Sequence, residues 1–189
     1  MKKIGITEWY VPLSGPSAIS LCKELGIEGM QITDQGGPTR NYPLLDDKIK
    51  NQYFEAVGDS GFTLYSLHPL TLAREPGIQF DIKSDIGQKA LEVYKKSIQT
   101  CREYNIPTVL LASFAGSKFK SRYEIQKTIE TLREYRKIAD DNGVRIVYES
   151  FCDLKTMLYI REEVGGINYC YDILNPLFFG FSDPKDDLE

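Results

Sequence analysis

The sequence lacks several features that would assign it to a function class at once. No basic cluster extends over a whole predicted face, and the net charge is −4, so nucleic acid is not the expected partner. Every apolar stretch is far shorter than the roughly 18 residues of a membrane span, so we expect no membrane partner either.

Cysteine pairs and targeting signals are also missing. The four cysteines form no C-x-x-C pair and lie in apolar surroundings, which favours reduced thiols in an intracellular protein. The first residues, "MKKIGITEWY", contain two lysines but no apolar region of a secretory signal. We therefore expect a cytoplasmic protein.

What is present is typical of a globular domain. Hydrophobic residues make up 42% of the 189 residues and charged residues 26%. This length is enough to bury a substantial core, and no linker, low-complexity tract or repeat divides it. We expect residues 1–189 to form a single domain.

Six short β-rich runs recur along the chain and lack strict polar alternation, which is typical of strands covered on both faces of a parallel sheet. They are residues 3–7, 29–33, 62–68, 108–114, 144–150 and 167–172. Helical patterns separate them. In one, Ile125, Ile129, Leu132, Tyr135 and Ile138 fall three or four residues apart and form one apolar stripe.

Each helical pattern ends at a residue suited to a left-handed backbone. Such residues commonly follow the last turn of a helix, and here they stand just before the next strand: Gly26, Gly61, Asn105, Gly143 and Gly165. Pro16 near the start of the first helix and a Ser121/Glu124 capping box are matching start signals. Five helices between six strands predict an α/β protein with a parallel sheet.

The predicted strands end on polar groups, which favours a barrel over a doubly wound sheet. These groups are Glu8, Asp34, His68, Ser113, Glu149 and Asp172. Barrels place their chemistry at the carboxyl ends of many strands, and the glycine-rich phosphate fingerprint of dinucleotide-binding folds is absent. A complete (β/α)₈ barrel typically has about 250 residues, so we expect an incomplete TIM-type barrel of about six βα units of eight.

The last two strand-end groups are both carboxylates: "RIVYES" ends near Glu149 and "NYCYD" ends at Asp172. A buried carboxylate costs several kcal/mol unless something pairs with it. A shared metal ion would neutralise both. Alternatively, each carboxylate caps a neighbouring loop or helix start.

The chain resembles the xylose-isomerase-like TIM barrels, the superfamily of sugar phosphate isomerases and epimerases that also contains endonuclease IV. "SLHPL" after the third strand, "YES" after the fifth and "YDILNP" after the sixth carry the resemblance. It covers the whole chain and about the first two thirds of the usual family length.

The resemblance implies that Glu149 and Asp172 ligate a divalent metal and that His68 lies near the substrate. The family's D-x-x-H motif reads here Asp172-x-x-Asn175, so an amide replaces an imidazole. The family's ligands on strands seven and eight have no counterpart. Oxygen ligands favour Mn²⁺ or Mg²⁺, with Co²⁺ or Zn²⁺ as alternatives.

The remaining candidates would contact substrate. Trp9 would stack on a sugar face or else pack in the core, and Asn175 would face the substrate beside the metal. Glu8 and Ser113 would line the site as substrate-binding groups or serve as caps, like Asp34. His68 is the only histidine, so it either contacts the substrate or is a structural residue. A single histidine also argues against the multi-zinc nuclease branch.

The expected function is metal-dependent isomerisation or epimerisation of a small sugar or sugar phosphate, with Glu149 and His68 as catalytic groups. Dehydration of a polyol ketone begins with the same proton abstraction, and a non-catalytic barrel fragment or binding remnant is the alternative from another class. With only two family ligands, the 189 residues alone are expected to bind metal weakly and to show no turnover.

Six parallel strands leave the first and sixth strands unpaired on one side. We expect the open side to be covered by self-association of two copies, or by the apolar "PLFFGF" segment at 176–181.

Overall fold

The computed structural model describes residues 4–36, 42–180 and 182–188. Its strands are β1 (Gly5–Thr7), β2 (Gly29–Thr33), β3 (Thr63–His68), β4 (Thr108–Ser113), β5 (Arg145–Ser150) and β6 (Asn168–Tyr169). Its α-helices are α1 (Pro16–Glu24), α2 (Asp47–Val57), α3 (Leu70–Arg74), α4 (Asp85–Glu103), α5 (Arg122–Asp141), α6 (Leu154–Val164), α7 (Leu174–Phe179) and α8 (Pro184–Leu188). The 3₁₀ turns are η1 (Glu8–Tyr10), η3 (Pro43–Leu45) and η4 (Ala115–Ser117).

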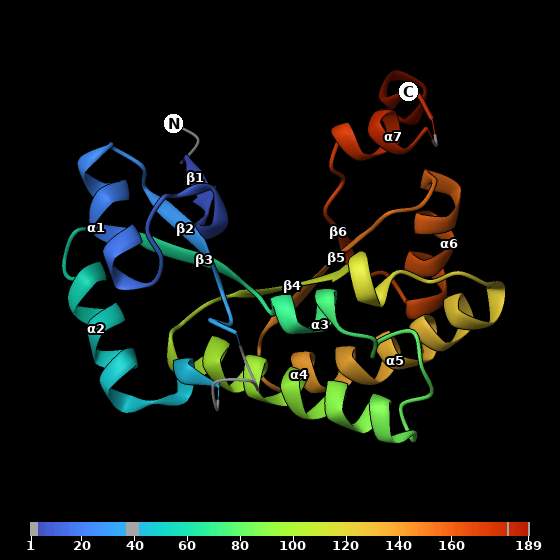
Figure 1. Cartoon of the computed structure of the whole chain (residues 1–189), viewed down its shortest axis with the longest axis horizontal. Coiled ribbons are helices and arrows are strands. Elements are labelled where there is room, and N and C mark those ends of the chain that lie inside the picture. The colour runs from blue at the N-terminus through green and yellow to red at the C-terminus, as the bar shows by residue number, and fades with distance from the viewer. Residues whose placement is uncertain (1–3, 37–41, 181, 189) are drawn as a thin grey trace.

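The six strands form one parallel sheet in chain order, β1-β2-β3-β4-β5-β6. Helices lie along the outside of the curved sheet, and α7 and α8 stand beyond β6, across from β1 (Figure 1). Sequential parallel strands with helices on the outer side are the architecture of a TIM-type barrel. The predicted α/β fold and the incomplete barrel are therefore confirmed.

The predicted helix ends are confirmed by the backbone. All five closing residues have a positive φ: Gly26 74°, Gly61 75°, Asn105 56°, Gly143 67° and Gly165 94°. The predicted start signals hold as well. Pro16 is the first residue of α1, and the Ser121 hydroxyl accepts the N–H of Glu124 at 3.2 Å.

The core lies between the sheet and the helices. The predicted stripe on α5 packs there, with Ile129, Leu132 and Tyr135 fully buried. Tyr135 stacks on Tyr94 of α4 with ring centroids 3.9 Å apart. These contacts fix the outer helices against β4 and β5 and thereby position the strand ends.

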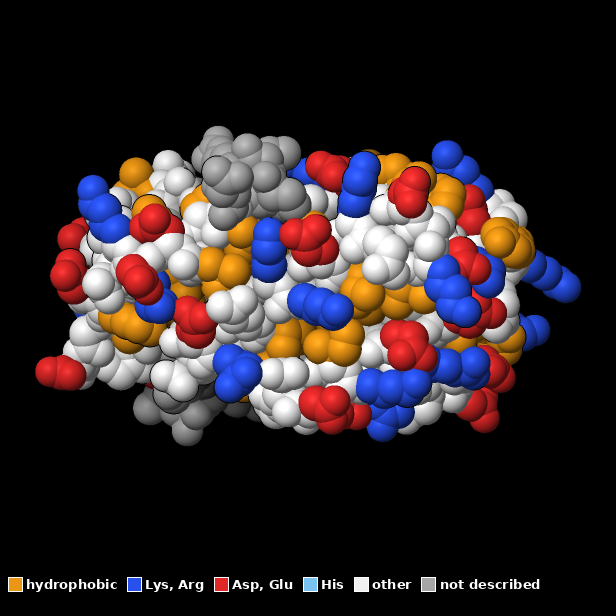
Figure 2. Space-filling model, turned by 90° about the horizontal axis from the view of Figure 1, so that it is seen from below, with side chains coloured by type: hydrophobic (Ala, Val, Ile, Leu, Met, Phe, Trp, Pro, Cys, Tyr) orange, Lys and Arg blue, Asp and Glu red, His pale blue; other side chains and the backbone are white. Residues whose placement is uncertain are grey.

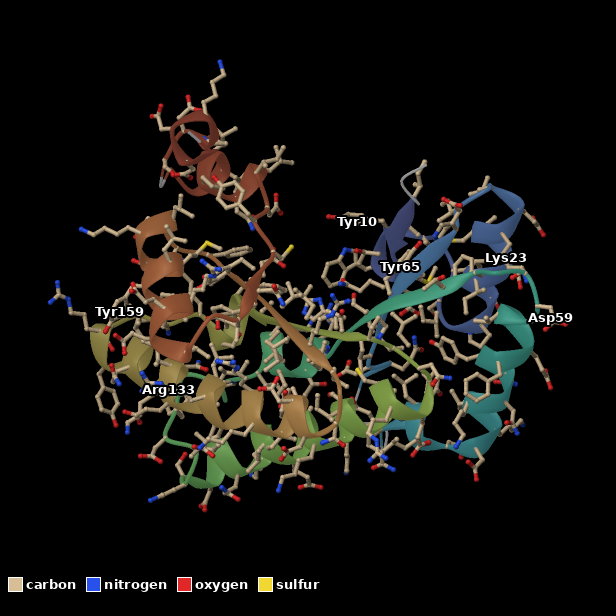
Figure 3. The ribbon with its side chains drawn as sticks, turned by 180° about the vertical axis from the view of Figure 1, so that it is seen from behind. Tyr10, Lys23, Asp59, Tyr65, Arg133 and Tyr159 are labelled. Atoms are coloured by element: carbon tan, nitrogen blue, oxygen red, sulfur yellow. The ribbon has the colours of Figure 1, made fainter. Side chains whose placement is uncertain are left out.

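Near the start of the sheet, an aromatic ring takes the place of side chains on two neighbouring strands. Tyr65 of β3, labelled in Figure 3, lies over Gly5 and Gly29, and a Cβ atom on either glycine would collide with its ring. Glycine at these positions therefore allows the ring of Tyr65 to approach β1 and β2 closely.

Two features differ from the prediction. The short helix α3 follows β3 and was not expected; it forms because Leu72 and Ala73 can be buried beneath it. β6 is also shorter than the expected 167–172. It pairs only with β5, and the Asp172 carboxylate accepts the N–H of Leu174 at 2.9 Å, which turns the chain toward α7.

The "PLFFGF" segment does not cover the open side in the part that the structure describes. Leu177 and Phe178 of α7 remain 58% and 84% exposed. A segment that closed the sheet would bury these side chains, so this expectation is wrong for them. Self-association through the open side stays a prediction.

The outer face carries charge of both signs. Acidic and basic side chains are interspersed over the face seen in Figure 2, with apolar patches between them. This mixture offers no single-sign surface to a polyanion on that face. Among the described residues, no helix is both long and apolar enough to cross a membrane.

Candidate active site

Glu8 follows β1 directly and holds the strand ends of β1 and β2 together. Its side chain is 3% exposed and accepts four hydrogen bonds. They come from the N–H of Gly15 at 2.6 Å, the N–H and hydroxyl of Thr33 at 2.7 and 3.0 Å, and the amide of Gln35 at 2.6 Å. A carboxylate with four donors is stable when buried. Glu8 therefore links the loops that follow β1 and β2 through hydrogen bonds, directly beside Trp9.

We expect Glu8→Gln to destabilise the fold. The amide places a donor among groups that only donate here, and an unpaired buried donor costs about 1–3 kcal/mol. At about 2–4 °C per kcal/mol for a domain of this size, calorimetry should record a melting temperature lower by several degrees. The control is Glu24→Gln, at the exposed end of α1. This change should leave the melting temperature unchanged. Equal melting temperatures for Glu8→Gln and the wild type would contradict this role.

His68 ends β3 and is completely buried, yet neither ring nitrogen has a hydrogen-bond partner among the described residues. The ring lies edge-on to Trp9, at 5.0 Å between centroids, and to Phe114, at 5.9 Å. Burial, and secondarily the charge of Arg74, lower the pKa of His68 to about 4. The imidazole is therefore neutral at pH 7, and its two nitrogens are unpaired.

Trp9 and Tyr10 lie in η1, directly after β1, at the carboxyl end of the strands, which is the mouth of the barrel. Trp9 is 42% exposed and covers one side of His68. Tyr10 is 77% exposed and extends from the β1 end of the sheet toward the C-terminal segment (Figure 3). A half-exposed indole can stack on a ligand, and the role of Trp9 as a substrate contact stays a prediction.

Asp34, directly after β2, and Ser113, at the end of β4, are both buried and hydrogen-bonded to neighbouring elements, and the predicted substrate-binding role of Ser113 stays a prediction. Asp34 is fully buried, and its carboxylate accepts the N–H of Thr71 at 3.2 Å at the start of α3. Burial raises the pKa of this carboxyl. The Ser113 hydroxyl is 1% exposed and accepts the hydroxyl of Tyr148 at 2.7 Å.

Glu149 and Asp172 lie at the ends of the neighbouring strands β5 and β6. Burial raises the pKa of Glu149, and the negative charge of Asp172 raises it further. The amide of Asn175 donates to Glu149 at 3.4 Å. The negative charge of Asp172 therefore acts on Glu149, the more enclosed of the two carboxylates. Asp172 also caps the start of α7, as the alternative interpretation proposed.

The predicted site residues form two groups. One contains Glu8, Trp9 and His68 on the β1–β3 side, and the other contains Glu149, Asp172 and Asn175 on the β5–β6 side. Across the residues that the structure describes, no three His, Cys, Asp or Glu side chains come close enough to hold a metal ion together.

The sequence interpretation missed three residues of the first group. Thr33 and Gln35 donate hydrogen bonds to Glu8, and the positive charge of Arg74 helps to lower the pKa of His68. The signal for Arg74 was its position in "HPLTLAR", six residues after His68. It was passed over because no helix was expected there.

A family model described as xylose isomerase-like TIM barrel matches residues 19–188. The chain belongs to this family. The "YES" and "YDILNP" motifs lie within the matched region, so the resemblance seen in the sequence is confirmed.

A curated relative is the 2-epi-5-epi-valiolone 7-phosphate 2-epimerase of Actinoplanes sp., 28% identical over 189 residues. The alignment covers 96% of this chain and 65% of that protein, so the chain spans about two thirds of the relative's length. This relative is therefore an epimerase that aligns with nearly the whole of this chain.

Two solved structures share the fold. A xylose isomerase-like TIM barrel protein from Mycobacterium smegmatis, in complex with magnesium, aligns with a TM-score of 0.73 at 13% identity, covering 99% of this chain and 72% of that one. D-psicose 3-epimerase from Clostridium cellulolyticum H10, with D-tagatose, aligns with a TM-score of 0.68 at 17% identity, covering 89% and 62%.

Proposed function

We propose that this chain carries the site of a metal-dependent isomerase or epimerase that moves a proton next to the carbonyl of a small sugar or polyol, phosphorylated or not. The observation that supports it most is the pair Glu149 and Asp172, two carboxylates at the ends of adjacent strands, where the charge of Asp172 adds to burial in raising the pKa of Glu149. The related epimerase and the sugar-bound neighbour agree with this substrate class.

The donor chemistry of this pair fits Mn²⁺ or Mg²⁺. Both are hard cations that are commonly bound through one or two carboxylates while water fills the remaining positions. A neighbour of the same fold was solved with magnesium. Glu149 and Asp172 would hold the ion. With two protein ligands, binding by the 189 residues alone should be weak.

In this proposal a bound divalent cation supplies electrostatic stabilisation of the negative charge that develops on the substrate carbonyl oxygen. Glu149 removes or returns the proton on the neighbouring carbon, because its carboxylate is partly desolvated and therefore a stronger base than one in water. Neutral His68, fully buried in this structure, donates to or accepts from a substrate hydroxyl once its ring is uncovered, since neither ring nitrogen has a hydrogen-bond partner among the described residues. Trp9 covers the sugar face.

The experiment uses a closed protein, a chimera in which this chain is joined after β6 to the part of the Actinoplanes relative that the alignment does not cover. With Mn²⁺ in D₂O and a panel of ketoses and polyol ketones, we expect deuterium to enter the carbon next to the carbonyl. The 189-residue chain by itself should show no deuterium exchange. A closed, folded protein that exchanges no substrate of the panel would favour the non-catalytic alternative, and release of water would favour a dehydratase.

A further inference from the structure

Arg74, the last residue of α3, is a cation at the barrel mouth that pairs with no acidic side chain among the described residues. It is exposed and lines an open cavity of about 410 Å³ together with Trp9 and Leu70. Eight ion pairs join other residues of the described ranges, and none of them includes Arg74. Apart from Glu8, the other residues that line this cavity are apolar or uncharged. The guanidinium of Arg74 is therefore available to an anion from solution.

The backbone that carries Arg74 is fixed at both ends. At the start of α3, the carboxylate of Asp34 accepts the N–H of Thr71. At its end, the Ser117 hydroxyl donates to the carbonyl of Ala73 at 3.1 Å. Gly116 packs directly against the carbonyl of Arg74, where a Cβ atom would collide. The guanidinium therefore projects from a rigid platform, which reduces the entropy lost when it binds a ligand.

Arg74 also shares the mouth with the candidate substrate contacts. Its positive charge contributes to the lowered pKa of His68, which places the guanidinium within electrostatic range of the imidazole. Trp9 lines the same cavity as Arg74, and its ring also lies edge-on to His68 at 5.0 Å between centroids. A ligand that stacks on Trp9 in this cavity is thus within the reach of Arg74.

The one carboxylate that lines this cavity does not neutralise Arg74. Glu8 is 3% exposed, and its two oxygens already accept four hydrogen bonds from Gly15, Thr33 and Gln35. The other acidic pair, Glu149 and Asp172, belongs to β5 and β6. A positive group on the β1–β3 side and the carboxylates on the β5–β6 side suit a substrate that carries an anionic group away from its reacting carbonyl.

We propose that Arg74 determines specificity by binding the phosphate group of a phosphorylated sugar or polyol, so that the site prefers phosphate esters to neutral sugars. Arginine presents a planar fork of donors that matches two phosphate oxygens at once. The inference rests on the proposed function, because it takes the mouth of the barrel as the substrate site.

The test uses the only tryptophan of the chain, Trp9, as a fluorescent reporter inside the same cavity. The 189-residue protein is titrated with D-fructose 6-phosphate, D-fructose and inorganic phosphate in the presence of a chelator, so that neither metal nor turnover is needed. The variants are Arg74→Gln, Arg74→Lys and Arg122→Gln. The last is a matched control, an arginine at the start of α5 that forms none of the described ion pairs.

We expect the wild type to bind fructose 6-phosphate at least 10-fold more tightly than fructose, as charge-assisted hydrogen bonds imply. Arg74→Gln should remove this preference while leaving the affinity for fructose unchanged, and Arg74→Lys should keep part of it. Arg122→Gln should behave as the wild type.

An undiminished preference in Arg74→Gln, or an equal loss in Arg122→Gln, would overturn the assignment of Arg74. Binding of fructose without any gain from the phosphate would overturn this inference and leave the proposed function standing. If neither sugar changes the fluorescence of Trp9, both the inference and the substrate site are wrong. Circular dichroism of each variant confirms that the fold is intact.

Discussion

Glu149→Gln in the closed protein should reduce deuterium exchange at the substrate carbon by about 10³-fold or more. A positioned acid or base contributes typically about 10²–10⁴-fold, and this change removes both the base and one of the two metal carboxylates. Glu149 is the more enclosed of the pair, with a pKa raised by burial and by Asp172. Exchange is followed by NMR at saturating Mn²⁺.

The matched control is Glu162→Gln, an exposed glutamate on α6 that forms none of the described ion pairs. It should exchange at the wild-type rate. If Glu149→Gln retains more than a tenth of the wild-type rate at saturating metal, the base is another residue and the assignment of Glu149 fails.

His68→Ala should lower the exchange rate by roughly 10²-fold, the usual scale for a positioned polar group. The imidazole is neutral at pH 7 and has no hydrogen-bond partner among the described residues; in the proposal a substrate hydroxyl becomes that partner. The alternative is a structural role through the rings of Trp9 and Phe114. If the folded fraction of His68→Ala turns over at the wild-type rate while its melting temperature collapses, the structural role is correct.

The pH dependence of stability provides a second readout for His68. Its folded pKa of about 4 lies below the unfolded value of about 6.5, so between these values the unfolded chain binds more protons. The wild type should therefore lose about 3 kcal/mol from this group as the pH falls from 6.5 to 4. His68→Ala should lack this loss. The raised pKa values of Asp34 and Glu149 act in the opposite direction in both proteins, so the comparison isolates His68.

The helix ends and the strand order could be predicted because both depend on local chemistry. Residues such as Gly165 and Asn105 adopt a left-handed backbone that few other residues tolerate. Buried parallel strands appear in the sequence as continuous apolar runs. The polar residues that follow these apolar runs stand at the carboxyl ends of the strands, so they marked the mouth of the barrel.

The contacts between distant loops could not be predicted. Glu8 accepts from Gly15, Thr33 and Gln35, and this arrangement depends on how β1 and β2 pair rather than on any motif. Helix α3 has only five residues, too few for a periodic pattern, and its position depends on Asp34 and Ser117. Arg74 was missed with it.

The most direct test of the central claim is Mn²⁺ binding to the 189-residue chain, followed by water proton relaxation, which detects weak complexes. The wild type should show weak, saturable binding at one site. Glu149→Gln and Asp172→Asn should each abolish it. Both metal-free variants should be at least as stable as the wild type in urea at pH 7, because each change removes repulsion between two carboxylates. Unchanged Mn²⁺ affinity in both variants would show that Glu149 and Asp172 do not hold the metal.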